Sequence, residues 1–453
     1  MPVVKYRLEQ TSEKTEKEGR RSSNKVKQQV YAIPWLAIFA LGMGMLVYGV
    51  AESYGPVVTI SSFVPSQYYY VGLSLSFIAG GFGALLAGFL TDVLGRKMSF
   101  LVVAAMVLTG IAIFLIAPTN IVALVISFVL VGMAAIGMET PVLTALSEMM
   151  PSKWRGNILV IIQNFGNIGV AIVFIPAMLG FSIMQDKIAY AILFLAPLFA
   201  LILGYWAIKE TQPWSAITGK ISIDVSEAWK AIEREDIKPV SPNTGMSFRY
   251  IFLTIIGIVQ DVAFVWITYD IGYLYFSTYS EIIPIVGGLA MAIVGIAAGM
   301  LVHRFSRKQM LLISYGSLAI FWMLFLAYVN ITGSLNGLGL LILAAVLFIP
   351  VELTWGVRAM LEPELFPTKS RGRWISYARM AVWVIAGVIT LLLSIYFAPP
   401  STASVNKIIS YFNLSSAIVM LIFLVAVALS IIWYYKGFET GSRSLLGHDI
   451  KHL

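Results

Sequence analysis

Long apolar runs recur along the whole chain, and this recurrence limits what the chain can fold into. A run of about 20 apolar residues spans a bilayer as a helix. Runs of that length recur about twelve times, at 32–55, 68–91, 98–117, 120–146, 156–180, 188–208, 247–276, 281–302, 309–330, 335–361, 374–397 and 407–435. They are too continuous for barrel strands, which alternate polar and apolar positions. Because lipid admits only helices and closed barrels, the runs predict an all-α integral membrane protein with twelve transmembrane helices.

The composition excludes the soluble alternatives. Hydrophobic residues make up 59% of the 453 positions and charged residues 12%, whereas soluble domains carry about 25% charged residues. Disorder of the body of the chain is excluded because disorder requires low hydrophobicity and high charge. Without cysteine, a disulfide scaffold is excluded as well.

The basic residues give an orientation. The net charge of +8 could suggest a nucleic-acid partner. Nearly all of the 31 Lys and Arg, however, lie in the two tails and in the connections after even-numbered spans; the exceptions are Lys187, Lys407, Arg358 and Arg379. Positive charge marks the cytoplasmic side. We therefore expect both termini in the cytoplasm of a cell-membrane protein, and no nucleic-acid partner.

Polar stretches divide the chain into segments. The longest internal one, 209–246, contains a stretch with helical spacing at 222–232. We expect a cytoplasmic N-terminal tail (1–30), a six-helix bundle (31–208), a cytoplasmic linker (209–246), a second six-helix bundle (247–436) and a cytoplasmic C-terminal tail (437–453).

The two halves repeat each other. Glu148-x-x-Pro151-x-Lys-x-Arg155-Gly returns as Glu364-x-x-Pro367-x-Lys-x-Arg371-Gly, and the segment Gly88 to Lys97 returns less fully as Gly299 to Lys308. Two parallel six-helix repeats place a substrate site between them near the midplane. The twelve helices are therefore predicted to form two six-helix pseudo-repeats.

Charges in these connections form a candidate cytoplasmic gate. We expect pairs of Asp92 with Arg96 and of Glu148 with Arg155, and the repeat adds Glu364 and Arg371. Rim pairs between two bundles can latch one conformation and release another. The alternative is that these are solvated loop charges that only set the topology.

Several motifs resemble the major facilitator superfamily, and within it the sugar porters. Gly88-x-Leu90-x-Asp92-x-x-Gly95-Arg96-Lys97 is similar to the superfamily signature between helices 2 and 3, and the repeated Glu-x-x-Pro-x-x-x-Arg-Gly is a sugar-porter motif. The helix 6 and helix 12 endings around Glu210 and Glu439 resemble those of sugar porters. The resemblance implies a secondary transporter of a sugar or similar small polar metabolite that works by alternating access. It also adds Glu210 and Glu439 to the gate and makes Gln163 a substrate ligand.

Other positions resemble proton-coupled phosphate symporters. Gln260 fits a sugar-porter glutamine in span 7, but the second glutamine is replaced by Asp261. Gly137-Met-Glu139-Thr-Pro141 is similar to the helix 4 signature of the phosphate symporters. The resemblance implies proton symport, with Asp261 and Glu139 as coupling acids. It leaves open a proton-coupled transporter of inorganic phosphate or of an organic acid anion.

Charges inside the spans are functional candidates, because they are unfavourable in lipid. Besides Asp261 and Glu139, they are Glu52, Asp270, Glu352, Arg358 and Arg379. Glu139 could instead join the rim pairs. Glu52 and Asp270 lie near the extracellular ends and are expected to be wetted, whereas Glu352 and Arg358 are expected to form structural ion pairs with neighbours.

Arg379 occupies the repeat position of Gln163. Its guanidinium suits a carboxylate or phosphate of a substrate, or it neutralises Asp261 or Glu139. Trp355, with Trp266, Tyr269 and Trp383, either lines a cavity or packs between helices. The expected substrate-binding residues are Gln163, Asn167, Gln260, Asp261, Trp355 and Arg379.

Catalytic and cofactor signatures are missing from the sequence. His303, His448 and His452 fall outside the spans, and no phosphate-binding loop of the ATPase type is present. We expect no enzyme activity, no cofactor and no metal. The expected partners are a small-molecule substrate, protons and the lipid bilayer, with the protein as a monomer.

Overall fold

A computed structural model describes residues 34–61, 63–65, 68–180, 191–211, 214, 215, 218, 240–367, 370–443 and 445. Its contacts separate the first 35 residues from a second unit, Leu36–Leu453, which contains the helical bundle. The expected N-terminal tail, the stretch 222–232 of the linker and most of the C-terminal tail lie outside the described residues.

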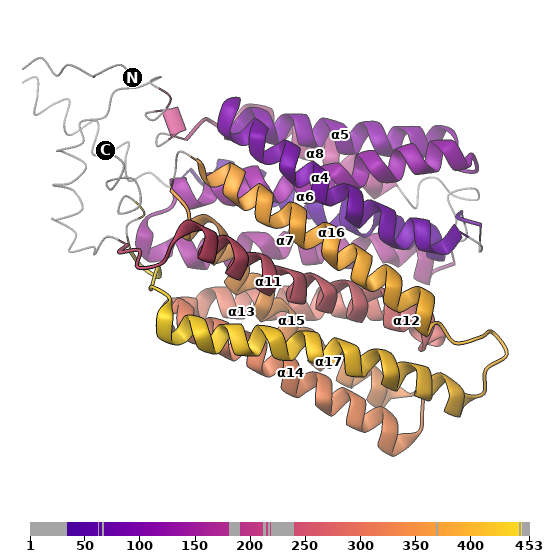
Figure 1. The fold of residues 1–453 in the computed structure, drawn as a ribbon. Helices are drawn as coiled ribbons and strands as arrows, with labels where there is room; N and C mark the ends of the chain where they lie inside the picture. Colours follow the sequence, from indigo (N-terminus) through magenta and orange to yellow (C-terminus); the bar gives the residue numbers. More distant parts are fainter. Residues whose placement is uncertain are drawn as a thin grey trace, which may run out of the picture. The chain divides into compact units, whose positions relative to one another are not determined.

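Every regular element among the described residues is a helix, as the sequence predicts (Figure 1). The first half contains α2 (Trp35–Glu52), α3 (Tyr54–Ile60), α4 (Tyr69–Val93), α5 (Arg96–Ile116), α6 (Ile121–Met149), α7 (Ser152–Met178) and α8 (Ala191–Ala207). The second half contains α11 (Met246–Val265), the π-helical η2 (Trp266–Asp270), α12 (Ile271–Leu274), η3 (Ser277–Tyr279), α13 (Ile282–Leu301), η4 (Val302–Arg304), α14 (Arg307–Thr332), α15 (Leu338–Glu364), α16 (Arg371–Phe397) and α17 (Val405–Lys436).

The predicted spans all correspond to helices. In the described part of the chain, 11 helices are long and apolar enough to cross a membrane, with α2 and α3 counted together and α11 counted through α12. The remaining span is the shorter apolar helix α8, which follows the undescribed residues 181–190. The expected all-α membrane architecture is thus confirmed.

Four helices extend beyond the predicted spans at their charged ends. Helix α6 continues to Met149 and α15 to Glu364, while α7 begins at Ser152 and α16 at Arg371. Hydropathy ends a span where charges begin. Here four of those charges, Glu148, Arg155, Glu364 and Arg371, have buried side chains held in ion pairs, and the helices continue through them.

Two helix pairs make the most extensive contacts between the halves. Helix α4 packs against α16 (Figure 1), and α7 packs against α13. A Cβ at Gly88 of α4 would lie 2.2 Å from the Ser376 side chain on α16, and one at Gly295 of α13 would lie 1.9 Å from the Asn164 amide on α7. Small residues allow such close approach of membrane helices, so both of these helix pairs depend on glycine.

Candidate functional site

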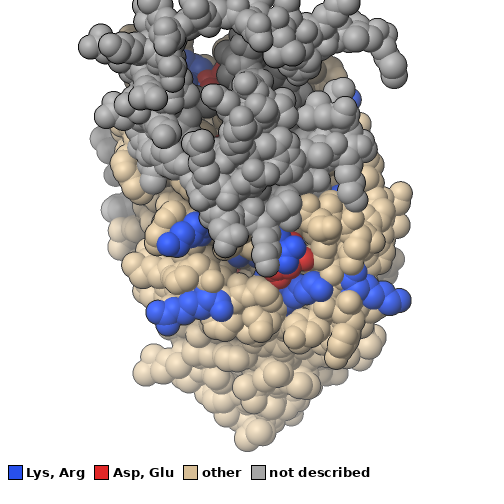
Figure 2. All heavy atoms as spheres, turned by 90° about the vertical axis from the view of Figure 1, so that its left-hand side faces the viewer, with Lys and Arg blue, Asp and Glu red and all other residues tan. Residues whose placement is uncertain are grey.

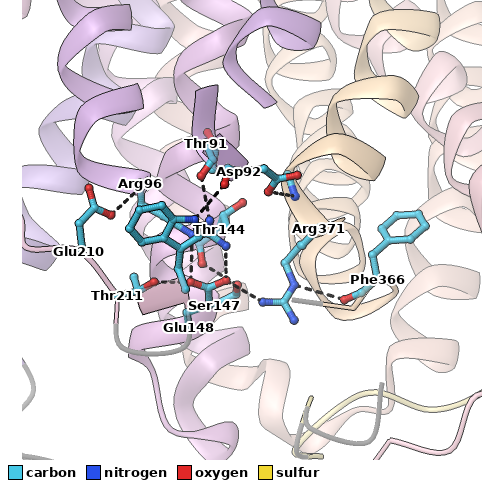
Figure 3. A network of polar contacts seen from close by, with 12 residues as sticks. Thr91, Asp92, Arg96, Thr144, Ser147, Glu148, Glu210, Thr211, Phe366 and Arg371 are labelled. Carbon is cyan, nitrogen blue, oxygen red and sulfur yellow. Dashed lines mark hydrogen bonds and ion pairs between the residues drawn. The ribbon is translucent and has the colours of Figure 1, made fainter. Parts of the chain in front are cut away.

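Glu148, at the end of α6, is the centre of a charge cluster at one end of the bundle (Figure 3). Arg96 of α5 binds its two carboxylate oxygens with Nη2 and Nε at 2.7 and 3.1 Å. Arg371 of α16, in the other half, approaches from the opposite side with Nη1 3.1 Å from Oε1. The Thr211 hydroxyl also donates to Glu148. One carboxylate therefore holds guanidinium groups from both halves.

Glu364, at the end of α15, has the equivalent set of partners. Arg307 of its own half binds it with Nε at 3.0 Å, and Thr440 donates to it at 2.6 Å. Arg155 of the first half binds it across the interface, with Nη2 3.1 Å from Oε1. The internal repeat thus builds two matching clusters, and each half contributes one arginine to the other.

These pairs differ from the expected ones. Arg96 binds Glu148, and Arg155 binds Glu364, so neither of the expected local pairs forms. Asp92 instead accepts from the backbone N–H groups of Gly372 and Arg373 at 3.2 and 3.0 Å and from Arg373 Nε at 3.2 Å. The first N–H groups of a helix have no partner within it and attract anions. The N–H groups at the beginning of α16 therefore bind Asp92 in place of the expected Arg96.

Glu210 and Glu439 lie at helix N-termini and do not cross between halves. Glu210 accepts from the N–H groups of Arg96 and Lys97 at 2.8 and 3.1 Å, and Glu439 accepts from the N–H of Arg307 at 3.0 Å. Carboxylates stabilise helices at this end. These two residues fix the helix starts from which the cluster arginines project.

The same end of the bundle carries much of the exposed positive charge. Figure 2 views it directly: Lys and Arg side chains spread over its visible part, and acidic side chains gather near the centre. Arg373 is half exposed, whereas the cluster arginines are buried. The buried pairs therefore lie beneath a basic rim.

A chain of alternating charges crosses the interior of the membrane spans. Arg379 of α16 binds Glu139 of α6 and Glu362 of α15. Arg358 of α15 binds the other oxygen of Glu362 at 2.8 Å and Oδ1 of Asp261 on α11 at 2.5 Å. All five side chains are buried. Two guanidinium groups thus bind three carboxylates, and Glu139 is the member from the first half.

Polar side chains extend this charge chain at both ends. Gln260 accepts from Arg358, and Trp355 Nε1 donates to Glu139 at 3.1 Å. The ring of Trp355 stacks on Tyr48, with 5.7 Å between centroids. The second oxygen of Asp261 has no hydrogen-bond partner among the described residues.

Gln163 and Asn167 of α7 converge on Glu352 of α15. Gln163 Nε2 lies 3.3 Å from Oε1 of Glu352, and Asn167 Nδ2 lies 2.7 Å from Oε2. Arg358 forms ion pairs with neighbours, as expected, through Asp261 and Glu362, whereas Glu352 is bound by these amides and has no ion pair among the described residues. The amides instead link a carboxyl group of one half to the other half.

The structure brings all six expected substrate-binding residues into these two groups. Gln260, Asp261, Trp355 and Arg379 belong to the charge chain, and Gln163 and Asn167 to the amide group around Glu352. Glu52 and Asp270, expected to be wetted, are each only 2% exposed, since neighbouring helices cover them.

Glu362 is the member of the charge chain that sequence reasoning missed. It follows the predicted end of its span at 361 and precedes the repeated Glu364 motif. The available signal was its spacing, since residues four apart on a helix are neighbours and Arg358 lies four positions before it.

Aromatic contacts join the halves beyond the charge chain. Tyr269 of η2 stacks with Phe77 of α4 and Phe174 of α7, and its hydroxyl hydrogen-bonds to Ser53 at 2.9 Å. Trp383 stacks on Phe77 as well. A π-helical turn inside a membrane helix is common at functional sites, and here it buries Tyr269 between two helices of the other half.

Comparison with known proteins places this architecture in a family. The chain matches the sugar (and other) transporter family over residues 10–244 and 266–441. It is 26% identical to the glucose transporter GlcP of Staphylococcus epidermidis, over 90% of this chain and 95% of that protein. It is 25% identical to the probable metabolite transport protein CsbC of Bacillus subtilis, over 91% and 93%.

Solved structures agree on the fold. The proton:xylose symporter XylE from E. coli superposes with a TM-score of 0.71 at 16% identity, covering 93% of this chain and 99% of that one. The human organic anion transporter MFSD10 gives 0.64 at 14% identity, covering 88% and 99%. The molecule is a multi-pass membrane transporter with the major facilitator superfamily fold. It belongs to the sugar (and other) transporter family, whose members are transporters and not enzymes.

Proposed function

We propose that this protein carries a sugar across the cell membrane by alternating access, together with protons. The observation that supports it best is a set of two ion pairs between the halves, Arg371 with Glu148 and Arg155 with Glu364. We call them the crossed pairs, because each half contributes the arginine of one pair and the glutamate of the other. Both join the halves at one end of the bundle. Breaking them would let the halves separate there, which alternating access requires.

A neutral substrate suits the interior better than an anion. Arg358 and Arg379 each bind two carboxylates of the protein. A phosphate or organic acid would have to displace one of these carboxylates from a buried pair. The amides of Gln163, Asn167 and Gln260, by contrast, can exchange hydrogen bonds with sugar hydroxyls, and Trp355 offers a ring on which a sugar can lie.

Two of the similar proteins also favour a sugar as the substrate. One is a glucose transporter and another a proton:xylose symporter. We assign Gln163, Asn167, Gln260 and Trp355 to the substrate, and we assign Arg379 to holding Glu139 and Glu362. We further propose a monomer with both termini in the cytoplasm and bundles at 31–208 and 247–436.

Counterflow in proteoliposomes tests this proposal. Vesicles loaded with unlabelled D-glucose or D-xylose should accumulate the labelled sugar, whereas vesicles loaded with phosphate or lactate should not accumulate the labelled anion. Trans-stimulation is a property of carriers, so it separates a transporter from a channel. Counterflow of phosphate or lactate without counterflow of either sugar would replace the sugar with an anion substrate.

A further inference from the structure

Three buried acids have no cation partner among the described residues. They are Glu52, Asp270 and Glu352, whereas Glu139, Asp261 and Glu362 are all bound by arginine. Glu52 accepts from Tyr48 of its own helix. Glu352 alone of the three is held by side chains of the opposite half, Gln163 and Asn167.

The surroundings of Glu352 supply no charge to neutralise it. Helix α13, packed on α7 and α15, has no titratable residue. Several titratable groups on the neighbouring elements have their own partners among the described residues: Arg155 on α7, Glu139 on α6, Asp261 on α11, Tyr315 on α14, Arg379 on α16, Arg358 and Glu362 on α15, and Tyr48 with Glu52 on α2. None of these forms a hydrogen bond or ion pair with Glu352 in the described part of the chain.

The amides around Glu352 can satisfy it in either protonation state. In the observed arrangement both amide nitrogens donate to the carboxylate, and the carbonyl oxygens of Gln163 and Asn167 have no partner. An amide carries a donor and an acceptor on opposite corners. Rotating the Gln163 amide about its last bond would present its oxygen to a protonated Glu352, whose O–H would then donate to it.

We propose that Glu352 binds the coupled proton and that Gln163 links proton binding to substrate binding. This rests on the proposed sugar transport. Protonation forms one O–H bond at the carboxyl group and changes the role of the Gln163 amide from donor to acceptor. Its N–H groups are then free for a sugar hydroxyl. The proton enters from water on one side of the membrane and leaves to water on the other.

The same event loosens a link between the halves. The ionised carboxylate is bound by amides of α7 while belonging to α15, and charge-assisted hydrogen bonds are stronger than neutral ones. Protonation converts them to neutral bonds. Protonation of Glu352 therefore weakens this link between the halves.

Proton movement driven by sugar is the direct test. In proteoliposomes containing a pH-sensitive dye, adding D-glucose or D-xylose to wild type should move protons with the sugar. Glu352→Gln should lower this dye signal by about tenfold or more, with sugar counterflow still measurable, and Glu352→Asp should restore part of the signal. Glu52→Gln is the matched control, since Glu52 is also buried and has no cation partner among the described residues, but accepts its hydrogen bond from Tyr48 of its own helix. It should keep the signal.

An infrared measurement tests the site without any sugar. Purified wild-type protein titrated with pH should show the carbonyl band of a protonated carboxylic acid, and Glu352→Gln should remove that band while Glu52→Gln should not. If wild type fails to exchange either sugar, the transport proposal is wrong and the infrared band alone decides on proton binding. Full dye signal in Glu352→Gln, or loss of the signal in Glu52→Gln only, would overturn the assignment to Glu352.

Discussion

The indole Nε1 of Trp355 donates a 3.1 Å hydrogen bond to Oε1 of Glu139, and the two residues occupy equivalent positions of the repeat, 216 apart in sequence. Ser53 and Tyr269 are also 216 apart and also hydrogen-bonded. Positions related by the repeat therefore meet where the halves contact each other. Glu139 is bound on one side by Trp355 and on the other by Arg379, so this one carboxylate holds α6 to two helices of the second half in the interior.

Removing Arg379 should destabilise the protein through the charges it leaves behind. In Arg379→Met, Glu139 loses its cation and Glu362 keeps only Arg358. Breaking a buried pair from one side costs about 3–5 kcal/mol, and we expect a large fall in the melting temperature of the purified protein. The variant Arg373→Met, on the exposed rim, should melt close to wild type.

A second substitution distinguishes charge from lost packing. Arg379→Met combined with Glu139→Gln removes the unpaired carboxylate and leaves Glu362 with Arg358. We expect most of the lost stability to return. A double variant as unstable as Arg379→Met would show that the guanidinium acts by filling space and not by neutralising charge.

The sequence predicts the helices well, because a long apolar run is a local signal, and the repeated motif marks the charged residues at the helix ends. It predicts partners poorly. Asp92 and Arg96 are neighbours in sequence, yet Asp92 binds the start of α16 and Arg96 binds Glu148. Which charges pair depends on how α4, α7 and α15 pack against helices of the other half. The hydrophobic periodicity of a single helix does not predict that packing.

Glu362 shows the same limit in the membrane interior. Hydropathy places the end of its span just before it, because an isolated carboxyl group is unfavourable in lipid. Arg358 and Arg379 remove that cost by pairing with it. The helix therefore continues. Glu362, which hydropathy assigns to a loop, lies at the centre of the charge chain between Arg358 and Arg379.

Breaking one crossed pair should open the end of the bundle that contains Glu148 and Glu364. Met360 is fully buried beside Gly156 of the other half, and the absence of native cysteine makes Met360→Cys a clean reporter. We expect Arg371→Ala to raise its labelling rate by a water-soluble maleimide about tenfold, equivalent to about 1.4 kcal/mol. Lys97→Ala is the control, because Lys97 binds the Tyr205 carbonyl within its own half. Equal labelling rates in the two variants would contradict a gating role.

A side chain at Gly88 should prevent the same end from closing. The added Cβ would lie 2.2 Å from Ser376 and 2.6 Å from the Gly372 carbonyl oxygen. Gly88→Val should therefore make the Met360→Cys reporter react rapidly and abolish net sugar uptake. Gly316→Val introduces the same side chain where nothing lies within 4 Å and should leave reporter labelling slow. A slow reporter in Gly88→Val would mean that α4 and α16 can separate without opening this end.

The amide group depends on a glycine of a third helix. A Cβ at Gly295 would lie 1.9 Å from Asn164 Nδ2, and the Asn164 side-chain oxygen accepts from Asn167, which in turn binds Glu352. Gly295→Ala should push Asn164 away and disturb this hydrogen-bonded row while leaving Arg358 and Arg379 in place. We expect sugar affinity, measured by calorimetry with D-glucose and D-xylose, to fall by about tenfold, or about 1.4 kcal/mol. Gly316→Ala should bind as wild type does. Unchanged affinity in Gly295→Ala would remove Asn167 from the substrate site, because its position could then shift without consequence for binding.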